Sequence, residues 1–450
     1  MPEAAFRVTT ARVFAIAVPA MLANLTTPLL GIVATTAIGR LGEAALLGGV
    51  AMASVIFDCV FWLFGFLRMG TVAFTAQAVG ASDPLEVRAM LARGLLIAAV
   101  IGLALVAMQV PLRLVVFPLM GGSAAVTDAA ALYFTIRMWS APLALANYVL
   151  LGWMIGRARA GLALAVQIVI NVANMAATLT LVLGAGMGVA GAAWAAILAE
   201  ALGLAVGLAI ARRLLGGTLG VPRAVLLDRA KLTRMMAVNR DIMLRTAALV
   251  GAFMFFTAQG ARAGDVTLAA NAVLGNFILV GSFFLDGLAN AAEQLCGRSV
   301  GARDRTGFAR ATKLVLMWGF TFAIAVTVAF LAFGTFLIDL TTTNEEVRRM
   351  AREFMVLAAL APVCGVMAYG YDGVYIGATW ARDMRNLMLV SFLVFLAAWA
   401  LLTPLGNAGL WAALLVFFVA RGALQALRYP ALLRTSFAGL PSAMPASVPP

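Results

Sequence analysis

The chain has 450 residues, of which 64% are hydrophobic and only 11% are charged. A soluble domain is typically about half apolar and about a quarter charged, so this composition excludes an ordinary soluble protein. The net charge of +13 would suggest a nucleic-acid partner in a soluble protein, but here the basic residues lie in short connections between apolar runs. We therefore predict an all-α integral membrane protein with the lipid bilayer, and no nucleic acid, as its partner.

Apolar runs of about 20 residues or more, the length that a helix needs to cross the hydrocarbon, follow one another along the whole chain. The first run is too long for a signal-peptide core and lacks a small-residue cleavage site, so we expect it to be retained. If both termini are cytoplasmic, the inner side receives most of the arginines and lysines, as the positive-inside rule requires. Twelve transmembrane helices are predicted, at roughly 13–38, 44–69, 89–112, 129–155, 161–184, 188–211, 239–261, 266–294, 310–338, 352–378, 385–404 and 408–428.

The two halves of the chain resemble each other at a shift of about 221 residues. AVGASDP (78–84) recurs as SVGARDR (299–305), and LLGWMIG (150–156) aligns with YDGVYIG (371–377). Because each half holds an even number of spans, the halves are expected to be related by a pseudo-two-fold axis along the membrane normal, an arrangement typical of alternating-access transporters. The predicted units are an N-lobe at 1–211, a basic cytoplasmic linker at 212–238, a C-lobe at 239–435 and a disordered tail at 436–450.

Several carboxylates stand inside predicted spans of the second half. Asp286 and Glu293 are seven residues apart in FLDGLANAAEQ (284–294), which places them on one helical face with Asn290 between them. Asp372 occupies the position that aligns with an apolar leucine in the first half. An ionisable group inside a span is a functional candidate by default, and a carboxylate cluster can exchange protons or bind a sodium ion or an organic cation.

A structural interpretation of the same residues stays open: Glu293 would pair with Arg298 near the cytoplasmic end, and Asp286 would only tie helices together. In the first half, Glu200 caps its span or pairs with an arginine, and Asp58 is isolated on its helix. The chain contains no histidine, so proton-driven switching has to use carboxylates. Its three cysteines show no metal-ligand spacing, and it carries no nucleophile-elbow or metalloprotease motif, so we predict neither a metal site nor an enzyme.

Motifs along the whole chain resemble the multidrug and toxic compound extrusion (MATE) transporters and, within them, the bacterial DinF-type branch. They include PLLGIV (28–33), SAPLALANYVLLGW (140–153), LDGLANAAE (285–293) and DGVYIGAT (372–379). The resemblance implies a V-shaped pair of six-helix lobes in the bacterial inner membrane. It further implies a monomeric secondary antiporter, without a cofactor, that exports organic cations or toxic amphiphiles in exchange for protons or sodium.

The same resemblance implies a set of site residues. Asp286, Glu293 and Asp372 match acids of the family's C-terminal lobe, and we group them with Asn290, Asn271 and Asp58 as candidates for substrate or ion binding. The predicted N-lobe cavity comprises Ala34, Thr35, Asn171, Asn174, Thr178, Glu200 and Arg68.

The chain departs from the family pattern in the N-lobe. Where relatives carry an aspartate that is protonated during transport, this chain has Ala34, and Thr178 replaces a second aspartate. Two missing acids at sites expected to cooperate favour natural loss of an N-lobe proton site over a single engineered change. The neutral groups that remain can bind a ligand by hydrogen bonds but cannot titrate near neutral pH.

Coupling must then use the C-lobe acids or Asp58, or be weak, and we favour the C-lobe acids. Two alternatives stay open. One is a weakly coupled facilitator, because the N-lobe acid is absent. The other is a flippase for a lipid-linked or amphiphilic substrate, which would favour a long basic groove, whereas the acids found here favour cations.

Overall fold

The computed structural model describes residues 7–218 and 220–438, and within them every regular element is a helix. Residues 439–450 of the predicted tail lie outside the described part. The first nine helices are α1 (Thr10–Gly39), α2 (Ala44–Leu63), α3 (Phe66–Gly80), α4 (Pro84–Ala107), α5 (Gln109–Met120), α6 (Ala124–Arg137), α7 (Ala141–Gly156), α8 (Ala160–Leu179) and α9 (Gly188–Leu214). The remainder are α10 (Arg223–Leu226), α11 (Arg229–Arg262), α12 (Asp265–Gly301), α13 (Arg305–Thr341), α14 (Glu345–Gly377), α15 (Ala381–Leu402) and α16 (Gly406–Ser436).

These helices account for the twelve predicted spans. In the described residues, eleven stretches are long and apolar enough to cross a membrane, and the last of them, Ala381–Ser436, contains both α15 and α16. The short 3₁₀ turn Thr403–Leu405 and the left-handed Gly406 separate these two helices. Further predicted spans are broken inside: α2 gives way to α3 at Phe64 and Gly65, α4 gives way to α5 at Met108, and α6 gives way to α7 through a 3₁₀ turn at Met138–Ser140.

Several helices extend beyond their predicted ends because polar residues cap them outside the apolar run. The Asp228 side chain accepts a hydrogen bond from the Lys231 amide, so α11 starts ten residues before the predicted span and includes the last part of the predicted linker. Asp83 and Asp304 cap α4 and α13 in the same way. Sequence periodicity marks the hydrocarbon width, whereas the helix itself continues until a cap ends it.

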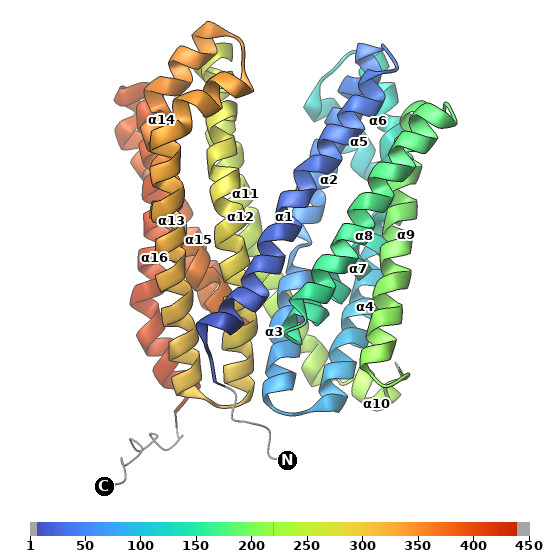
Figure 1. Cartoon of the computed structure of the whole chain (residues 1–450), viewed down its shortest axis with the longest axis vertical. Coiled ribbons are helices and arrows are strands. Elements are labelled where there is room, and N and C mark those ends of the chain that lie inside the picture. Colours follow the sequence, from blue (N-terminus) through green and yellow to red (C-terminus); the bar gives the residue numbers. More distant parts are fainter. Residues whose placement is uncertain (1–6, 219, 439–450) are drawn as a thin grey trace.

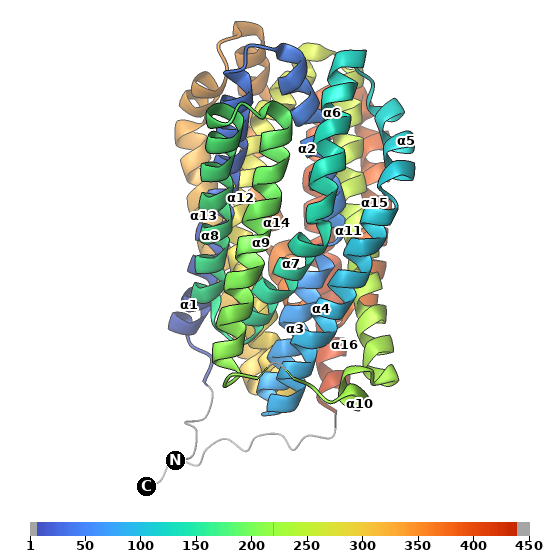
Figure 2. The same cartoon turned by 90° about the vertical axis from the view of Figure 1, so that its right-hand side faces the viewer.

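The helices form two lobes that diverge like the arms of a V (Figure 1). One arm contains α1 to α9 and the other α11 to α16, and the arms approach each other at the bottom of the view, where α10 lies in the connection between them. Figure 2 shows that the helices run roughly parallel to the long axis of the molecule. The chain therefore enters and leaves each lobe at the bottom end.

The repeat is visible in backbone conformation as well as in sequence. In the described residues, four non-glycine residues have a left-handed φ: Ser82, Ala158, Arg303 and Thr379. They form two pairs, each separated by the 221-residue shift of the sequence repeat. Each follows a helix end in an equivalent turn, and in the turns at Ser82 and Arg303 the next residue is the capping aspartate. The turns between α3 and α4 and between α12 and α13 are therefore copies of one structure.

Glycines let the lobes approach closely at the bottom end. A Cβ on Gly80 of α3 would collide with the Arg298 backbone of α12, and a Cβ on Gly301 would collide with the Gln77 backbone. Gly80 and Gly301 are repeat partners, and so are Gln77 and Arg298. The contact is thus reciprocal about the pseudo-two-fold axis, as expected for two copies of one lobe packed face to face.

Two amide side chains, the half-buried Gln77 and the buried Gln294, also join the lobes. Gln77 Nε2 of α3 donates to the carbonyl of Gly377 on α14 at 2.9 Å, and Gln294 Nε2 of α12 donates to the carbonyl of Gly156 on α7 at 3.4 Å. Gly156 and Gly377 are again repeat partners. Backbone contact and paired hydrogen bonds thus hold this end together.

Candidate functional site

A buried ion-pair network occupies the C-lobe, built from three helices. Asp372 of α14 is only 4% exposed, and its Oδ2 accepts from Arg245 of α11 and, at 2.7 Å, from Arg421 of α16. Its Oδ1 accepts from Gln425 Nε2 at 2.7 Å. Both carboxylate oxygens are therefore satisfied by protein donors. Two guanidinium groups share one carboxylate, so removing that carboxylate would leave two like charges buried together.

The predicted stripe on α12 lies beside this network. Asp286 is half-buried, whereas Asn290 and Glu293 are 4% and 3% exposed. Asn290 Nδ2 donates to the Asp286 carbonyl at 2.9 Å, and Asn290 Oδ1 accepts from Arg68 Nη1 of α3 at 2.5 Å. Arg68 belongs to the other lobe, so this bond crosses between the two bundles. The sequence predicted the stripe and the inward position of Arg68, and the structure brings them together.

The two stripe carboxylates differ from Asp372 in their partners. Within the described part of the chain, no hydrogen bond or ion pair reaches the Asp286 carboxylate, and Glu293 Oε2 is buried without a partner. The cations that act on Asp286 are Arg68, Arg245 and Arg421. The group as a whole contains three carboxylates and three guanidiniums, so it is formally balanced when all six are charged. A change in protonation or ligand at Asp286 or Glu293 would upset that balance.

The N-lobe presents a neutral polar face instead. On α8, Asn171 is 1% exposed; its Nδ2 donates to Thr26 Oγ1 of α1 at 2.7 Å and its Oδ1 accepts from Gln167 at 2.9 Å. Further along α8, Thr178 donates to Asn174 Oδ1 at 3.3 Å. These groups join α1 to α8 and line one face of α8, just before a π-helical turn at Thr180–Gly184. Such turns recur at functional positions in helices.

Ala34, the position at which the family resemblance leads us to expect an acid, lies on α1. Ala34 is half-buried and Thr35 is exposed, both in the helix that contains Pro19 and Pro28. Each proline removes a backbone hydrogen bond, so α1 has two points at which a helix bends easily.

Glu200 and Asp58, the two acids of the first half that were predicted as site residues, do not belong to the group of three carboxylates and three guanidiniums. Glu200 of α9 is half-buried, and both its carbonyl and its Oε2 accept from Asn147 of α7, at 2.9 and 2.6 Å. Asp58 is exposed on α2. Of the two interpretations of Glu200, pairing with an arginine is not seen among the described residues: Arg137 instead donates to Tyr133 at 2.7 Å and lies 4.8 Å from the ring centre of Phe57.

Asn271 lies apart from the other C-lobe candidates. It exchanges two hydrogen bonds of 2.9 Å with Asn407 and accepts a third, also 2.9 Å, from the Trp411 indole. It sits near the start of α12, fifteen residues before Asp286, which corresponds to about 22 Å along a helix. Its contacts tie the start of α12 to the start of α16.

Sequence reasoning missed three members of the network: Arg245, Arg421 and Gln425. Arg421 stands in the apolar run LLVFFVARGALQ, where an ionisable group inside a span is itself a signal. Arg245 lies in NRDIMLR, just inside the seventh span. The pairing of both with Asp372 has no signature in any local pattern, because the three residues come from three helices.

Comparisons with known proteins agree with this architecture. A family model described as MatE matches residues 19–180 and 242–400. The chain is 37% identical over 409 residues to the DNA damage-inducible protein F of Escherichia coli K12, covering 90% of this chain and 89% of that protein. It is 27% identical over 382 residues to a probable multidrug resistance protein NorM of Caulobacter vibrioides, covering 79% and 78% of the two chains.

Solved structures share the fold. A MATE protein in its straight conformation superimposes with a TM-score of 0.86 at 17% identity, over 95% of this chain and 96% of that one. An outward-facing multidrug resistance transporter of the MATE family gives 0.81 at 16% identity, over the same shares of the two chains. The two-lobe architecture, the matched segments and the 37% identical relative together establish that this chain belongs to the MATE family of multidrug and toxic compound efflux transporters.

Proposed function

We propose that this transporter is a secondary antiporter, which exports organic cations or other toxic amphiphiles in exchange for protons. We assign the coupling to Asp286 and Glu293 of α12. In this scheme Asp372 holds Arg245 and Arg421 in place rather than exchanging the coupling ion itself, because its two oxygens are already bonded to three donors.

The observation that carries this proposal is the contrast in partners within one buried group. Asp372 is fully bonded, whereas Glu293 Oε2 is buried without a partner in the described part of the chain. A buried acceptor without a partner is unfavourable, so it is expected to bind a proton, a water molecule or a cation. Asp286 lies two turns away on the same face, in reach of the same exchange.

The link between the lobes supports the same assignment. Arg68 of the N-lobe bonds to Asn290, which stands between the two carboxylates on α12. When the carboxylates lose their protons, their attraction for the Arg68 guanidinium increases and favours the approach of the lobes. When they are protonated, that attraction weakens. A proton taken up at this point thus changes the energy of an inter-lobe contact, which is what coupling requires.

The N-lobe would supply neutral contacts. The Asn171, Asn174 and Thr178 side chains offer hydrogen bonds without charge, and Ala34 adds apolar surface. A wall of this kind suits amphiphiles of varied shape, because it imposes no charged partner on the substrate.

We place the bottom end of Figure 1 in the cytoplasm of a bacterial cell, with the protein monomeric in the inner membrane and both termini on the inner side. The basic residues support this orientation: Arg303 and Arg305 lie at the turn between α12 and α13, and Arg223 and Lys231 lie in and after α10. Excess Lys and Arg in short loops marks the cytoplasmic side.

The test is export of a fluorescent organic cation from proteoliposomes under separately imposed pH and sodium gradients. We expect the pH gradient to drive transport, and Asp286→Asn or Glu293→Gln to reduce the driven rate about tenfold or more. Asp265→Asn is the matched control, since it removes an exposed acid from the first turn of the same helix.

Each outcome discriminates between the alternatives. Wild-type driven rates in both Asp286→Asn and Glu293→Gln would reject the assignment. Transport driven by a sodium gradient alone would mean that the coupling ion is sodium instead of the proton, with the assignment of the site unchanged. A transport rate that is independent of both gradients would indicate a facilitator. Movement of a fluorescent lipid in place of the cation would indicate a flippase.

A further inference from the structure

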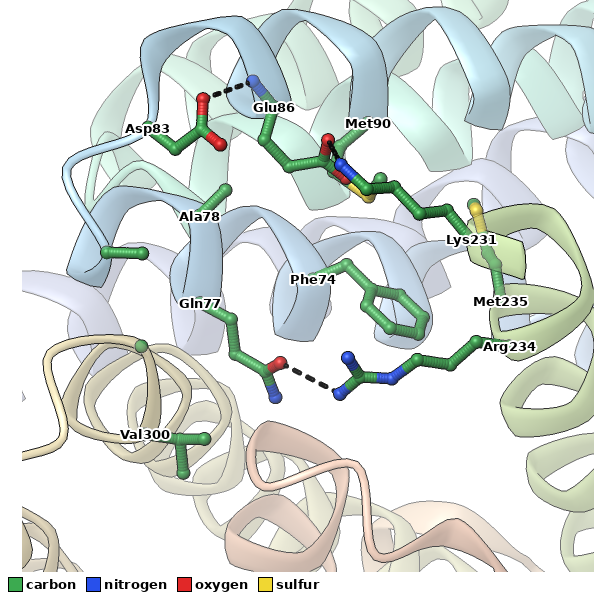
Figure 3. Close-up of a pocket in the computed structure, with 12 residues that line it drawn as sticks. Phe74, Gln77, Ala78, Asp83, Glu86, Met90, Lys231, Arg234, Met235 and Val300 are labelled. Carbon is green, nitrogen blue, oxygen red and sulfur yellow. Dashed lines mark hydrogen bonds and ion pairs between the residues drawn. The ribbon is translucent and has the colours of Figure 1, made fainter. Parts of the chain in front are cut away.

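A cavity lies at the bottom end of the molecule, away from the charged network around Asp372. Its volume is about 360 Å³, and its walls come from α3 and α4 of one lobe and from α11 and α12 of the other. Figure 3 shows the side chains that line it. A volume of this size is at the lower end of the range for small-molecule sites. Because both lobes contribute walls, anything bound here would contact both.

The inner wall of this cavity is apolar. Phe74, Ala78, Met90 and Met235 are 9%, 5%, 4% and 1% exposed, and Val300 completes the surface. Methionine and phenylalanine side chains adapt to hydrocarbon of varied shape. The wall therefore suits the apolar part of an amphiphile better than a hydrated ion.

The two carboxylates at the rim of the cavity, Glu86 and Asp83, already accept hydrogen bonds from other protein groups. Glu86 Oε1 accepts from Arg93 at 2.7 Å and its Oε2 accepts from Lys231 at 2.6 Å. Asp83 caps α4, with its side chain accepting from the Glu86 amide at 2.9 Å. Neither carboxylate is then available to a cationic ligand without breaking an existing contact.

One cation at the rim is left uncompensated. Arg234 has no carboxylate within 4.0 Å in the described part of the chain, and its nearest acceptors, Gln77 Oε1 and Thr379 Oγ1, are each 3.5 Å away. Its guanidinium lies 5.7 Å from the centre of the Phe74 ring, which forms part of the cavity wall. Figure 3 shows Arg234 reaching across the cavity toward Gln77, with Lys231 on the same side. The apolar space is thus bordered by Arg234, which has no carboxylate partner in the described residues, and by Lys231, which is paired with Glu86.

We propose that this cavity binds an amphiphile with a phosphate head group, held by Arg234 and Lys231, with its apolar part against Phe74, Met90 and Met235. A planar guanidinium and an ammonium are the groups that proteins commonly use for phosphate. Basic pockets between helices at the cytoplasmic side also suit acidic lipid head groups. Because the walls belong to both lobes, the bound amphiphile stabilises the arrangement in which the bottom end is closed.

The experiment measures binding of dihexanoyl phosphatidic acid to the full-length purified protein in detergent, by native mass spectrometry and by the rise in thermal unfolding midpoint. Dihexanoyl phosphatidylcholine, with the same chains and a zwitterionic head, and inorganic phosphate are the two comparison probes. We expect phosphatidic acid to bind about tenfold or more tightly than either. Equal binding of phosphatidylcholine, or equal binding of inorganic phosphate, would overturn the proposal.

Variants locate the site. Arg234→Gln is expected to weaken phosphatidic acid binding about tenfold, since it removes a charge-assisted contact. Arg229→Gln, which removes an exposed arginine from the same helix outside the cavity, should leave binding unchanged. Ala81→Phe fills the cavity from the end of α3 without changing any charge, and should also weaken binding. Full binding in Arg234→Gln or in Ala81→Phe, or an equal loss in Arg229→Gln, contradicts the assignment. These measurements do not depend on transport, so they fail or succeed independently of the coupling proposal.

Discussion

The two lobes have nearly the same backbone and different chemistry. Their turns, caps and contact glycines repeat at a constant shift, yet the C-lobe contains the buried ion-pair network around Asp372, whereas the polar face of α8 in the N-lobe consists of neutral amides and hydroxyls. At the positions equivalent to Arg245, Asp372 and Arg421, the N-lobe has Asn24, Leu151 and Glu200. None of these three N-lobe residues forms an ion pair in the described structure.

This contrast shows which features a duplicated fold has to keep. The path of the backbone requires the left-handed turns, and the close approach of the lobes requires the contact glycines. Both requirements hold in both copies, so both copies retain these features. A buried charge is stable only when it is paired, so one copy can lose a charge if it also loses the residues that pair with it. Under the coupling that we propose, the carboxylates that exchange the ion lie in the C-lobe, and the N-lobe contributes Arg68 and a face of neutral polar groups on α8.

The largest expected effect comes from breaking the C-lobe network. Asp372→Ala leaves Arg245 and Arg421 buried beside each other without their shared carboxylate, and should lower the free energy of unfolding by about 3–5 kcal/mol. The measurement is the thermal unfolding midpoint in detergent. A triple variant removes all three charges at once: Asp372→Leu and Arg245→Asn introduce the N-lobe counterparts, and Arg421→Gln introduces a neutral residue. This variant should recover most of the lost stability. If the triple variant were no more stable than Asp372→Ala, the network would not be what the substitution disrupts.

A smaller effect, equal in the two lobes, is expected at the shared contact. Gly80→Ala and Gly301→Ala each place a Cβ against the backbone of the opposite lobe, and each should cost about 1–3 kcal/mol by overpacking. Gly275→Ala is the control, since nothing lies within 4 Å of its Cβ, and the better helix former should be neutral or stabilising there. Unfolding midpoints of the three variants test the comparison. A cost at only one of the two contact glycines would show that the lobes do not meet reciprocally.

The smallest effect is expected at the N-lobe acid that stands alone. Asp58 is exposed on α2 and forms no hydrogen bond or ion pair in the described structure, so Asp58→Asn should change stability by less than about 0.5 kcal/mol. It should also leave the pH dependence of transport in proteoliposomes unchanged. Loss of that dependence in Asp58→Asn alone would move the coupling site into the N-lobe and remove the asymmetry described above.

Local sequence patterns were enough to predict the membrane-spanning helices, the two-lobe repeat and the polar stripe on α12. Run length and composition predicted twelve spanning helices, and self-similarity predicted two six-helix lobes; that the repeated segments at Ser82 and Arg303 form a common turn was shown by the structure. Spacing along one helix placed Asp286, Asn290 and Glu293 on one face, because the positions of residues within a helix follow from its pitch alone. The assignment of these residues to coupling stays a prediction.

The partners of those residues were decided only by tertiary structure. In a soluble helix, an apolar stripe reveals which face is buried, but lipid is as apolar as a protein interior, so a spanning helix carries little of that signal. Nothing local to α11, α14 or α16 indicates that Arg245, Asp372 and Arg421 point at one another. The rotation of each helix about its own axis depends on how all the helices pack. This packing pairs Asp372 with two arginines and leaves Glu293 Oε2 without a partner among the described residues.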